Sequence, residues 1–188
     1  QKKEGHDGLK VDIIARLCLR GFKEQVSPRK DSPTASKETQ KIFFAICANE
    51  KFDLENIDVT SAFLQGQDIP RKVYVKPPAE AEIPGKFWLM VKPGYGLYDA
   101  GRLWYLEVDR KLKEWGMEKV TGDEAFYMFR KENKLCGMIV LHVDDFLGGG
   151  NQIFRKEILD KVYSNFKCSK REVNKFRFTG VDIKKTSG

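Results

Sequence analysis

The stretch "LHVDDFLGGG", residues 141–150, joins an apolar segment to two adjacent carboxylates and then to three glycines. An Asp pair between strands is most often a solvated turn, but here the apolar segment is long. It comprises Leu135, Met138, Ile139, Val140, Leu141 and Val143. Such a run is typical of a strand buried on both faces. We therefore expect Asp144 and Asp145 at the rigid tip of a hairpin. The three glycines are expected to lead the chain out of this hairpin and to let another backbone segment approach closely.

A partner for these carboxylates is predicted in "FDLENIDVTSAFLQG", residues 52–66. A short apolar strand within it contains Leu54, Ile57 and Val59. Because successive side chains on a strand point to opposite faces, adjacent carboxylates do not easily share one ligand. If the two strands pair, Asp58 and Asp144 face one pocket, with Asp145 at its rim. Carboxylate oxygens with no His or Cys nearby favour Mg²⁺ or Mn²⁺ over zinc.

Composition limits the class of protein. The 188 residues suffice for one hydrophobic core or for two small subdomains that share one. Lys and Arg total 34 against 27 Asp and Glu, and this balance favours a polyanionic partner. Four widely spaced cysteines without a CxxC motif indicate reduced thiols inside a cell. No apolar stretch approaches the roughly 20 residues of a membrane span, so we expect a soluble protein.

Turn and capping signals divide the N-terminal part of the chain. Asp7 and Gly8 predict a tight turn, followed by a strand over residues 9–22 and an exposed loop over 23–35. Ser36 begins a helix that ends near residue 51. Its expected buried stripe is Ile42, Phe43, Ile46 and Cys47.

Strands dominate the rest of the chain. They are predicted at residues 54–59, 72–76, 86–92, 124–130, 135–143 and 175–183. A second long helix is capped by Asp99 and stopped by Gly116, and Asn151 caps a third. This mixed order predicts an α+β fold in which helices back an antiparallel sheet.

Six short blocks follow one another at characteristic spacing. They are "ARLCLRGF" at 15–22, "IDVTSAFLQG" at 57–66, "VYVKPP" at 73–78, "YGLYDAGRLWY" at 95–105, "HVDDFL" at 142–147 and "FTGVDI" at 178–183. In this order they resemble the reverse transcriptase domain of copia-type long-terminal-repeat retrotransposons. The resemblance extends from about Asp7 to Ile183.

The resemblance implies a right-hand polymerase architecture. Residues 1–50 would form a fingers-like hairpin, loop and helix. Residues 51–188 would form the palm, with interleaved fingers strands at about 67–100. The thumb and RNase H segments are expected to be absent.

The same resemblance implies the chemistry of the site. Asp58, Asp144 and Asp145 match the family's catalytic carboxylates. Together with the backbone carbonyl of Val59 they match the ligands of two Mg²⁺ (or Mn²⁺) ions. Asp145 matches the second acid of the hairpin, which helps to set the charge of the site.

The family's dNTP-binding positions match Arg16, Arg20, Val59, Phe63, Tyr95 and Gly96. The two arginines would grip the triphosphate, since a guanidinium binds phosphate in bidentate fashion. Phe63 would fill the space that a ribose 2′-hydroxyl needs. A solvated hairpin edge for the arginines, ordinary core for Phe63 and a plain turn for Gly96 are the alternatives.

Three positions depart from the family pattern. Ile14 stands where a Lys is frequent, and Gly101 stands where a Pro is frequent. His142, at the primer-contact position, replaces the commoner Tyr.

The implied function is an RNA- and DNA-templated DNA polymerase core, that is, a reverse transcriptase. Its partners would be a primed RNA or DNA template, dNTPs and the rest of a retrotransposon polyprotein with its integrase and RNase H. No membrane is involved, and the expected location is intracellular, in cytoplasmic virus-like particles and in the nucleus. The alternative is a catalytically weak, reverse-transcriptase-derived nucleic-acid-binding domain. A metal-dependent nuclease or nucleotidyltransferase on another fold is disfavoured by the "ARLCLRGF" block.

Overall fold

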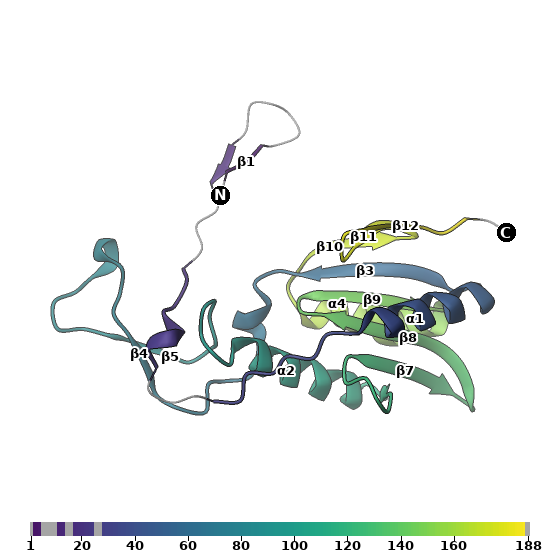
Figure 1. The fold of residues 1–188 in the computed structure, drawn as a ribbon, viewed down its shortest axis with the longest axis horizontal. Coiled ribbons are helices and arrows are strands. Elements are labelled where there is room, and N and C mark those ends of the chain that lie inside the picture. The colour runs from purple at the N-terminus through teal and green to yellow at the C-terminus, as the bar shows by residue number, and fades with distance from the viewer. Residues whose placement is uncertain (1, 5–10, 14–16, 25–27, 187–188) are drawn as a thin grey trace.

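A six-stranded antiparallel sheet forms the centre of the computed structural model, which describes residues 2–4, 11–13, 17–24 and 28–186 (Figure 1). The strand order is β10-β3-β9-β8-β7-β6, and every neighbouring pair is antiparallel. The strands are β3 (Asp53–Val59), β6 (Glu118–Lys119), β7 (Phe126–Lys131), β8 (Lys134–His142), β9 (Asp145–Gly150) and β10 (Cys168–Val173). The α+β prediction with an antiparallel sheet is confirmed.

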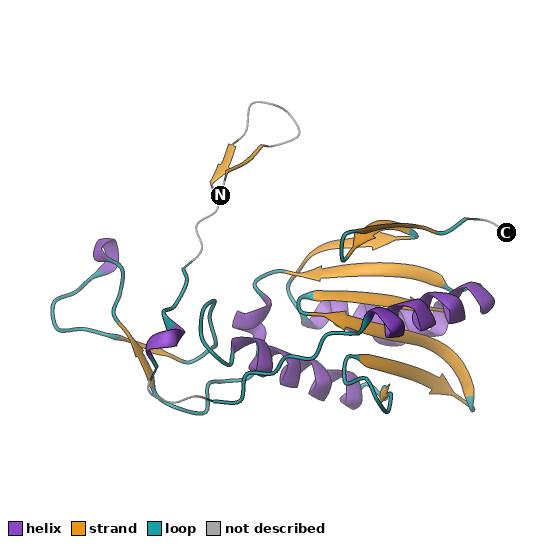
Figure 2. Cartoon of the chain, viewed as in Figure 1, coloured by secondary structure: helices purple, strands orange, loops and turns teal. Residues whose placement is uncertain are grey.

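Among the described residues, three two-stranded ribbons lie outside this sheet (Figure 2). They are β1 (Lys2–Glu4) with β2 (Val11–Ile13), β4 (Val73–Val75) with β5 (Trp88–Met90), and β11 (Lys175–Phe178) with β12 (Val181–Lys184). Short 3₁₀ turns occur at η1 (Gly21–Lys23), η2 (Ala62–Gln65) and η3 (Ala79–Ala81). In Figure 1 the β4–β5 ribbon lies on the opposite side of α2 from the sheet.

The helices begin directly after the residues predicted to cap their N-termini. They are α1 (Lys37–Asn49), α2 (Ala100–Glu114), and a continuous segment of α3 (Gln152–Phe154), a π-helical turn η4 (Arg155–Leu159) and α4 (Asp160–Asn165). The Ser36 hydroxyl oxygen accepts a hydrogen bond from the Thr39 amide at the start of α1. The Asn151 side chain likewise accepts hydrogen bonds from backbone amides at the start of α3. Gly116, at φ +87°, follows the end of α2. No helix in the described part of the chain is long and apolar enough to span a membrane.

The three glycines that follow the carboxylates belong to β9 and do not lead the chain out of a hairpin, so that expectation was wrong. A Cβ on Gly149 would lie 2.3 Å from the sulfur of Cys47 in α1. A Cβ on Gly148 would lie 2.7 Å from a methyl of Leu159, and Gly150 faces the ring of Phe154. Because alternate positions point to opposite faces, α1 covers one face of the sheet and the α3–α4 segment covers the other.

Two predicted strands differ from the structure. The strand predicted over 9–22 is described only at β2, since residues 17–20 are irregular and residues 21–23 form η1. Asp7, Gly8, Ile14 and Arg16 lie outside the described residues.

The strand predicted over 175–183 is the β11–β12 hairpin, which turns at Thr179 (φ +45°) and Gly180 (φ +85°). Strand β10, which was not predicted, forms the sheet edge beside β3.

Two side chains also differ from their predicted roles. Ile42 is 54% exposed, whereas Phe43 and Cys47 of the predicted α1 stripe are buried. Asp99 stands at the N-cap of α2 but makes no capping hydrogen bond. Its carboxylate instead binds Arg71, at 2.5 Å and 3.1 Å. A long-range ion pair has therefore taken the place of the local cap.

Candidate active site

Pairing of β3 with β9 brings the three predicted carboxylates to one end of the sheet. Asp58 lies directly opposite Asp145 on the neighbouring strand, and His142 of β8 lies opposite Asp145 on the other side. Asp144 occupies the turn between β8 and β9, where its backbone carbonyl accepts a hydrogen bond from the Val59 amide at 3.0 Å. All three carboxylates are half-buried. Asp145, which we expected at the rim, is therefore the direct cross-strand neighbour of Asp58.

The electrostatics of this cluster favour a bound positive charge. Burial and, to a lesser extent, the negative charges of Asp144 and Asp58 together raise the pKa of Asp145 from 3.8 to about 6. A hydrogen bond from the Asn56 side chain opposes the rise. Three carboxylates that repel one another in a half-buried setting are stabilised by a proton or by a cation.

The raised pKa of Asp145 predicts a pH-dependent stability. Between pH about 4 and 6 the folded protein holds a proton that the unfolded chain has released, so stability falls as the pH rises through this window. Asp145→Asn removes this penalty. We expect the variant to have a higher melting temperature than the wild type at pH 7, and we expect this difference in melting temperature to shrink towards pH 4.

Thermal denaturation followed by circular dichroism in EDTA measures this difference. The exposed Asp182 provides a matched control, since Asp182→Asn should show no such pH-dependent gain. If Asp145→Asn is no more stable than the wild type at pH 7, the assigned repulsion is absent.

A residue that sequence reasoning missed also contacts the cluster. The Ser169 hydroxyl, in β10, donates to the Asp58 carboxylate. This contact depends on the pairing of β10 with β3, which places Lys170 opposite Asp58. No local pattern marks Ser169, because its role follows from a strand pairing across more than 100 residues.

The structure also brings together most of the predicted nucleotide-side residues. The Leu19 amide donates to the Tyr95 carbonyl at 2.6 Å, and the Gly21 amide donates to the Gly96 carbonyl at 3.1 Å. The rings of Phe63 and Tyr95 are edge to face, with centroids 5.0 Å apart. Arg20, between the two amide donors, is exposed.

Glycine is required at position 96. Its φ is +86°, and a Cβ there would lie 2.1 Å from the Leu19 carbonyl oxygen. Gly96 thus permits the close approach of two backbone segments, which a plain turn does not need.

His142 lies at the end of β8, beside Asp145. Its ring packs edge to face on Phe178, with centroids 6.1 Å apart. Its Nδ1 atom is buried without a hydrogen-bond partner. The predicted primer-contact residue is therefore next to the carboxylates, but partly enclosed by the β11–β12 hairpin.

The donor set suits a hard divalent cation in its chemistry. Asp58, Asp144 and Asp145 offer carboxylate oxygens, and the buried Oδ1 of Asn56, beside Asp145, has no partner. Among the described residues, however, no three His, Cys, Asp or Glu side chains converge closely enough to hold a metal ion. The ligand types therefore lie at one end of the sheet, but their side chains are not drawn together as closely as a bound metal ion would require.

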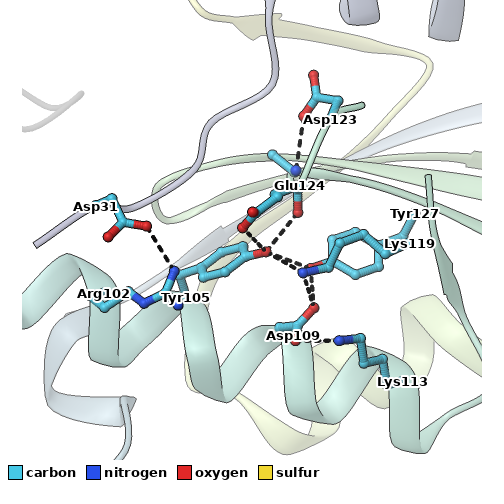
Figure 3. A network of polar contacts seen from close by, with 10 residues as sticks. Asp31, Arg102, Tyr105, Asp109, Lys113, Lys119, Asp123, Glu124 and Tyr127 are labelled. Carbon is cyan, nitrogen blue, oxygen red and sulfur yellow. Dashed lines mark hydrogen bonds and ion pairs between the residues drawn. The ribbon is translucent and has the colours of Figure 1, made fainter. Parts of the chain in front are cut away.

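A second polar cluster joins α2 to β6 and β7 (Figure 3). The Tyr127 hydroxyl donates to Asp109 at 2.7 Å, and the Lys119 ammonium binds Asp109 at 2.9 Å and Tyr105 at 2.7 Å. Burial, together with the Tyr105 hydroxyl and the Asp109 carboxylate, raises the pKa of Tyr127. The charges of this cluster are paired, so it anchors α2 to the sheet.

A family model described as "Reverse transcriptase (RNA-dependent DNA polymerase)" matches residues 1–188. The chain therefore belongs to this reverse transcriptase family. The retrovirus-related Pol polyprotein from transposon TNT 1-94 of Nicotiana tabacum is 30% identical over 152 residues, which are 78% of this chain and 11% of that protein. The corresponding polyprotein from transposon RE2 of Arabidopsis thaliana is 27% identical over 193 residues, covering 98% of this chain and 13% of that protein.

The yeast transposon Ty1-BL Gag-Pol polyprotein, from Saccharomyces cerevisiae, is 30% identical over 120 residues, or 63% of this chain and 6% of that protein. The resemblance to copia-type retrotransposon reverse transcriptases is thus confirmed. The chain spans only 6% to 13% of the length of these three relatives. No solved structure matches.

Proposed function

We propose that this chain is the core of an RNA- and DNA-templated DNA polymerase that uses two Mg²⁺ or Mn²⁺ ions. The observation that carries the proposal is the placement of Asp58, Asp144 and Asp145 at the same end of β3 and β9, where burial and mutual repulsion raise the pKa of Asp145. Asp58, Asp144 and the Val59 carbonyl would hold the ions, and Asp145 would set the charge of the site. Bound metal stabilises charge on the attacking and leaving oxygens of in-line displacement.

The neighbouring segments supply nucleotide binding in this proposal. Arg16 and Arg20 bind the triphosphate, and Tyr95 and Gly96 pack on the nucleotide and template. The contacts of residues 19 and 21 with residues 95 and 96 support one shared nucleotide site. His142 contacts the primer terminus.

The division of the chain follows the same proposal. Residues 1–50 contribute to the fingers, residues 51–188 form the palm, and the fingers strands at about 67–100 include the β4–β5 ribbon. The partners are a primed template, dNTPs and the other domains of a Pol polyprotein. The polymerase acts inside the cell, in cytoplasmic particles and in the nucleus.

The decisive assay is Mg²⁺-dependent dTTP incorporation on poly(rA) primed with oligo(dT). Purified wild-type protein should extend the primer, and Asp144→Asn should not. Template-primer binding without extension by the wild type would instead support a nucleic-acid-binding domain of weak catalytic power. Extension that is equal in both proteins would contradict the active-site assignment.

Phe63 is proposed to exclude ribonucleotides. Its ring, against Tyr95, would lie under the sugar of the incoming nucleotide and overlap a 2′-hydroxyl. We expect Phe63→Val to raise the rNTP-to-dNTP ratio of kcat/KM more than about tenfold, or about 1.4 kcal/mol. Steady-state kinetics with both nucleotides measure this ratio.

Phe44 offers a matched control, because it is also half-buried against the core but lies on α1. Phe44→Val should lower the melting temperature while leaving the ratio unchanged. An unchanged ratio in folded Phe63→Val would mean that Phe63 is ordinary core.

A further inference from the structure

The turn that carries Asp144 has an unfavourable backbone conformation. Val143, directly before the carboxylate pair, has φ +55°. This left-handed region is disfavoured for β-branched residues, because the Cβ approaches a backbone carbonyl oxygen. Such a conformation persists only where surrounding contacts hold it. The backbone of Val143 also sets the direction in which the chain continues into Asp144.

One such contact comes from α2. The indole Nε1–H of Trp104 donates to the Val143 carbonyl at 2.7 Å. The Trp104 side chain is only 1% exposed, so the donor is shielded from water, whereas Val143 is half-buried. Its ring packs on Phe146, with centroids 6.3 Å apart, and on Phe166, with centroids 5.0 Å apart. Since Phe146 follows Asp145 in β9, Trp104 contacts the chain on both sides of the carboxylate pair.

Helix α2 is anchored on either side of Trp104. At its N-terminus the buried Asp99 binds Arg71, which also binds Glu24 at 2.9 Å. Further along the helix, Asp109 binds Tyr127 and Lys119 on the sheet (Figure 3). The helix that carries the Trp104 indole is therefore itself fixed by ion pairs and hydrogen bonds on both sides of this residue.

We propose that Trp104 is a positioning residue for the catalytic turn. Its indole N–H holds the Val143 carbonyl, which keeps the left-handed turn in place and thereby orients Asp144 and Asp145. The inference rests on the proposed polymerase function. A purely packing role for Trp104 would need the volume of the ring but not its N–H group.

The test is Trp104→Phe, which keeps an aromatic ring and removes the donor. We expect kcat for dTTP incorporation to fall about tenfold or more, while the dTTP KM and the template-primer affinity change less than about threefold. Misplaced carboxylates slow the chemical step more than they weaken binding. Trp115→Phe is the matched control, since Trp115 follows α2 directly and also contacts Phe166. Its kcat should stay within about threefold of the wild type.

A second substitution separates positioning from packing. Glycine adopts a positive φ without a Cβ penalty, so Val143→Gly lessens the need for a contact that holds the turn. We expect Trp104→Phe/Val143→Gly to regain at least about threefold in kcat over Trp104→Phe alone. A lost ring volume would not be restored in this way. Equal loss of kcat in Trp104→Phe and Trp115→Phe, or no regain in the double variant, would overturn the proposal.

If Trp104→Phe does not fold, the indole N–H signals of ¹⁵N-labelled protein still test the contact. Val143→Gly should shift the Trp104 signal and leave the Trp115 signal in place, and an unmoved Trp104 signal would overturn the hydrogen bond.

Failure of the proposed polymerase function would give a different result. A wild type no more active than Asp144→Asn would refute the polymerase function. An active wild type in which Trp104→Phe and Trp115→Phe have the same kcat would refute only the role of Trp104.

Discussion

Asp58→Asn and Asp144→Asn are each expected to reduce dTTP incorporation by at least about a thousandfold, equivalent to about 4 kcal/mol of transition-state stabilisation. Phosphoryl transfer depends mainly on positioning and on charge stabilisation. An amide in place of either carboxylate removes a negative charge from the cluster that would hold the cations. The amide keeps nearly the same volume, so the fold should be retained.

Measurement of template-primer affinity separates the carboxylate charge that would hold the cations from the Lys and Arg charge that binds nucleic acid. Both variants should bind primed template within about threefold of the wild type, because counterion release by Lys and Arg governs that affinity. Asp182→Asn, at an 89% exposed side chain, is the matched control and should retain full activity. Wild-type turnover by Asp58→Asn or Asp144→Asn would refute the active-site assignment.

Glu55→Ala is expected to lower the free energy of unfolding by about 3 kcal/mol. Glu55 of β3 is only 2% exposed. It forms an ion pair with Arg155 at 2.9 Å and accepts a hydrogen bond from Arg171 at 2.6 Å. Arg171 also binds Asp160, at 2.7 Å. Loss of the carboxylate leaves two guanidinium groups without their shared partner between the sheet and the α3–α4 segment. Urea denaturation of the two proteins measures the loss.

Glu118→Ala is the matched control for this loss. Glu118 pairs with Arg130 at 3.0 Å, but its side chain is 68% exposed. Exposed ion pairs contribute less than about 1 kcal/mol. Equal losses in the two variants would mean that burial does not strengthen the Glu55 pairs.

Features that depend on neighbouring residues could be predicted from the sequence. The apolar run before Asp144 predicted β8, and the apolar positions around Asp58 predicted β3. Ser36 and Asn151 predicted helix starts that the structure confirms. The order of the six blocks predicted the reverse transcriptase family, which the family match confirms. Each of these signals depends on periodicity, on a cap or on spacing along the chain.

Other features were decided by contacts between distant segments. The glycines after Asp145 were expected to lead the chain out of the hairpin, but they pair with β3 and β8 within β9. Glycine is needed there because Cys47, Leu159 and Phe154 occupy the space where a Cβ would stand. Strand β10 was missed, since its burial does not alternate regularly and its place follows from its pairing with β3. The contact of Ser169 with Asp58 depends on that pairing.

By itself, the sequence determined the class of fold, the principal strands and helices, and which carboxylates to examine. Only the tertiary structure decided that Asp145 lies directly opposite Asp58, that Asp99 binds Arg71 instead of capping α2, and that Trp104 holds the Val143 carbonyl. The physical reason is that local patterns report backbone preference and burial. Strand register and the partner of a buried polar group depend on which distant segments pack together, because each such group must find its partner within the folded chain.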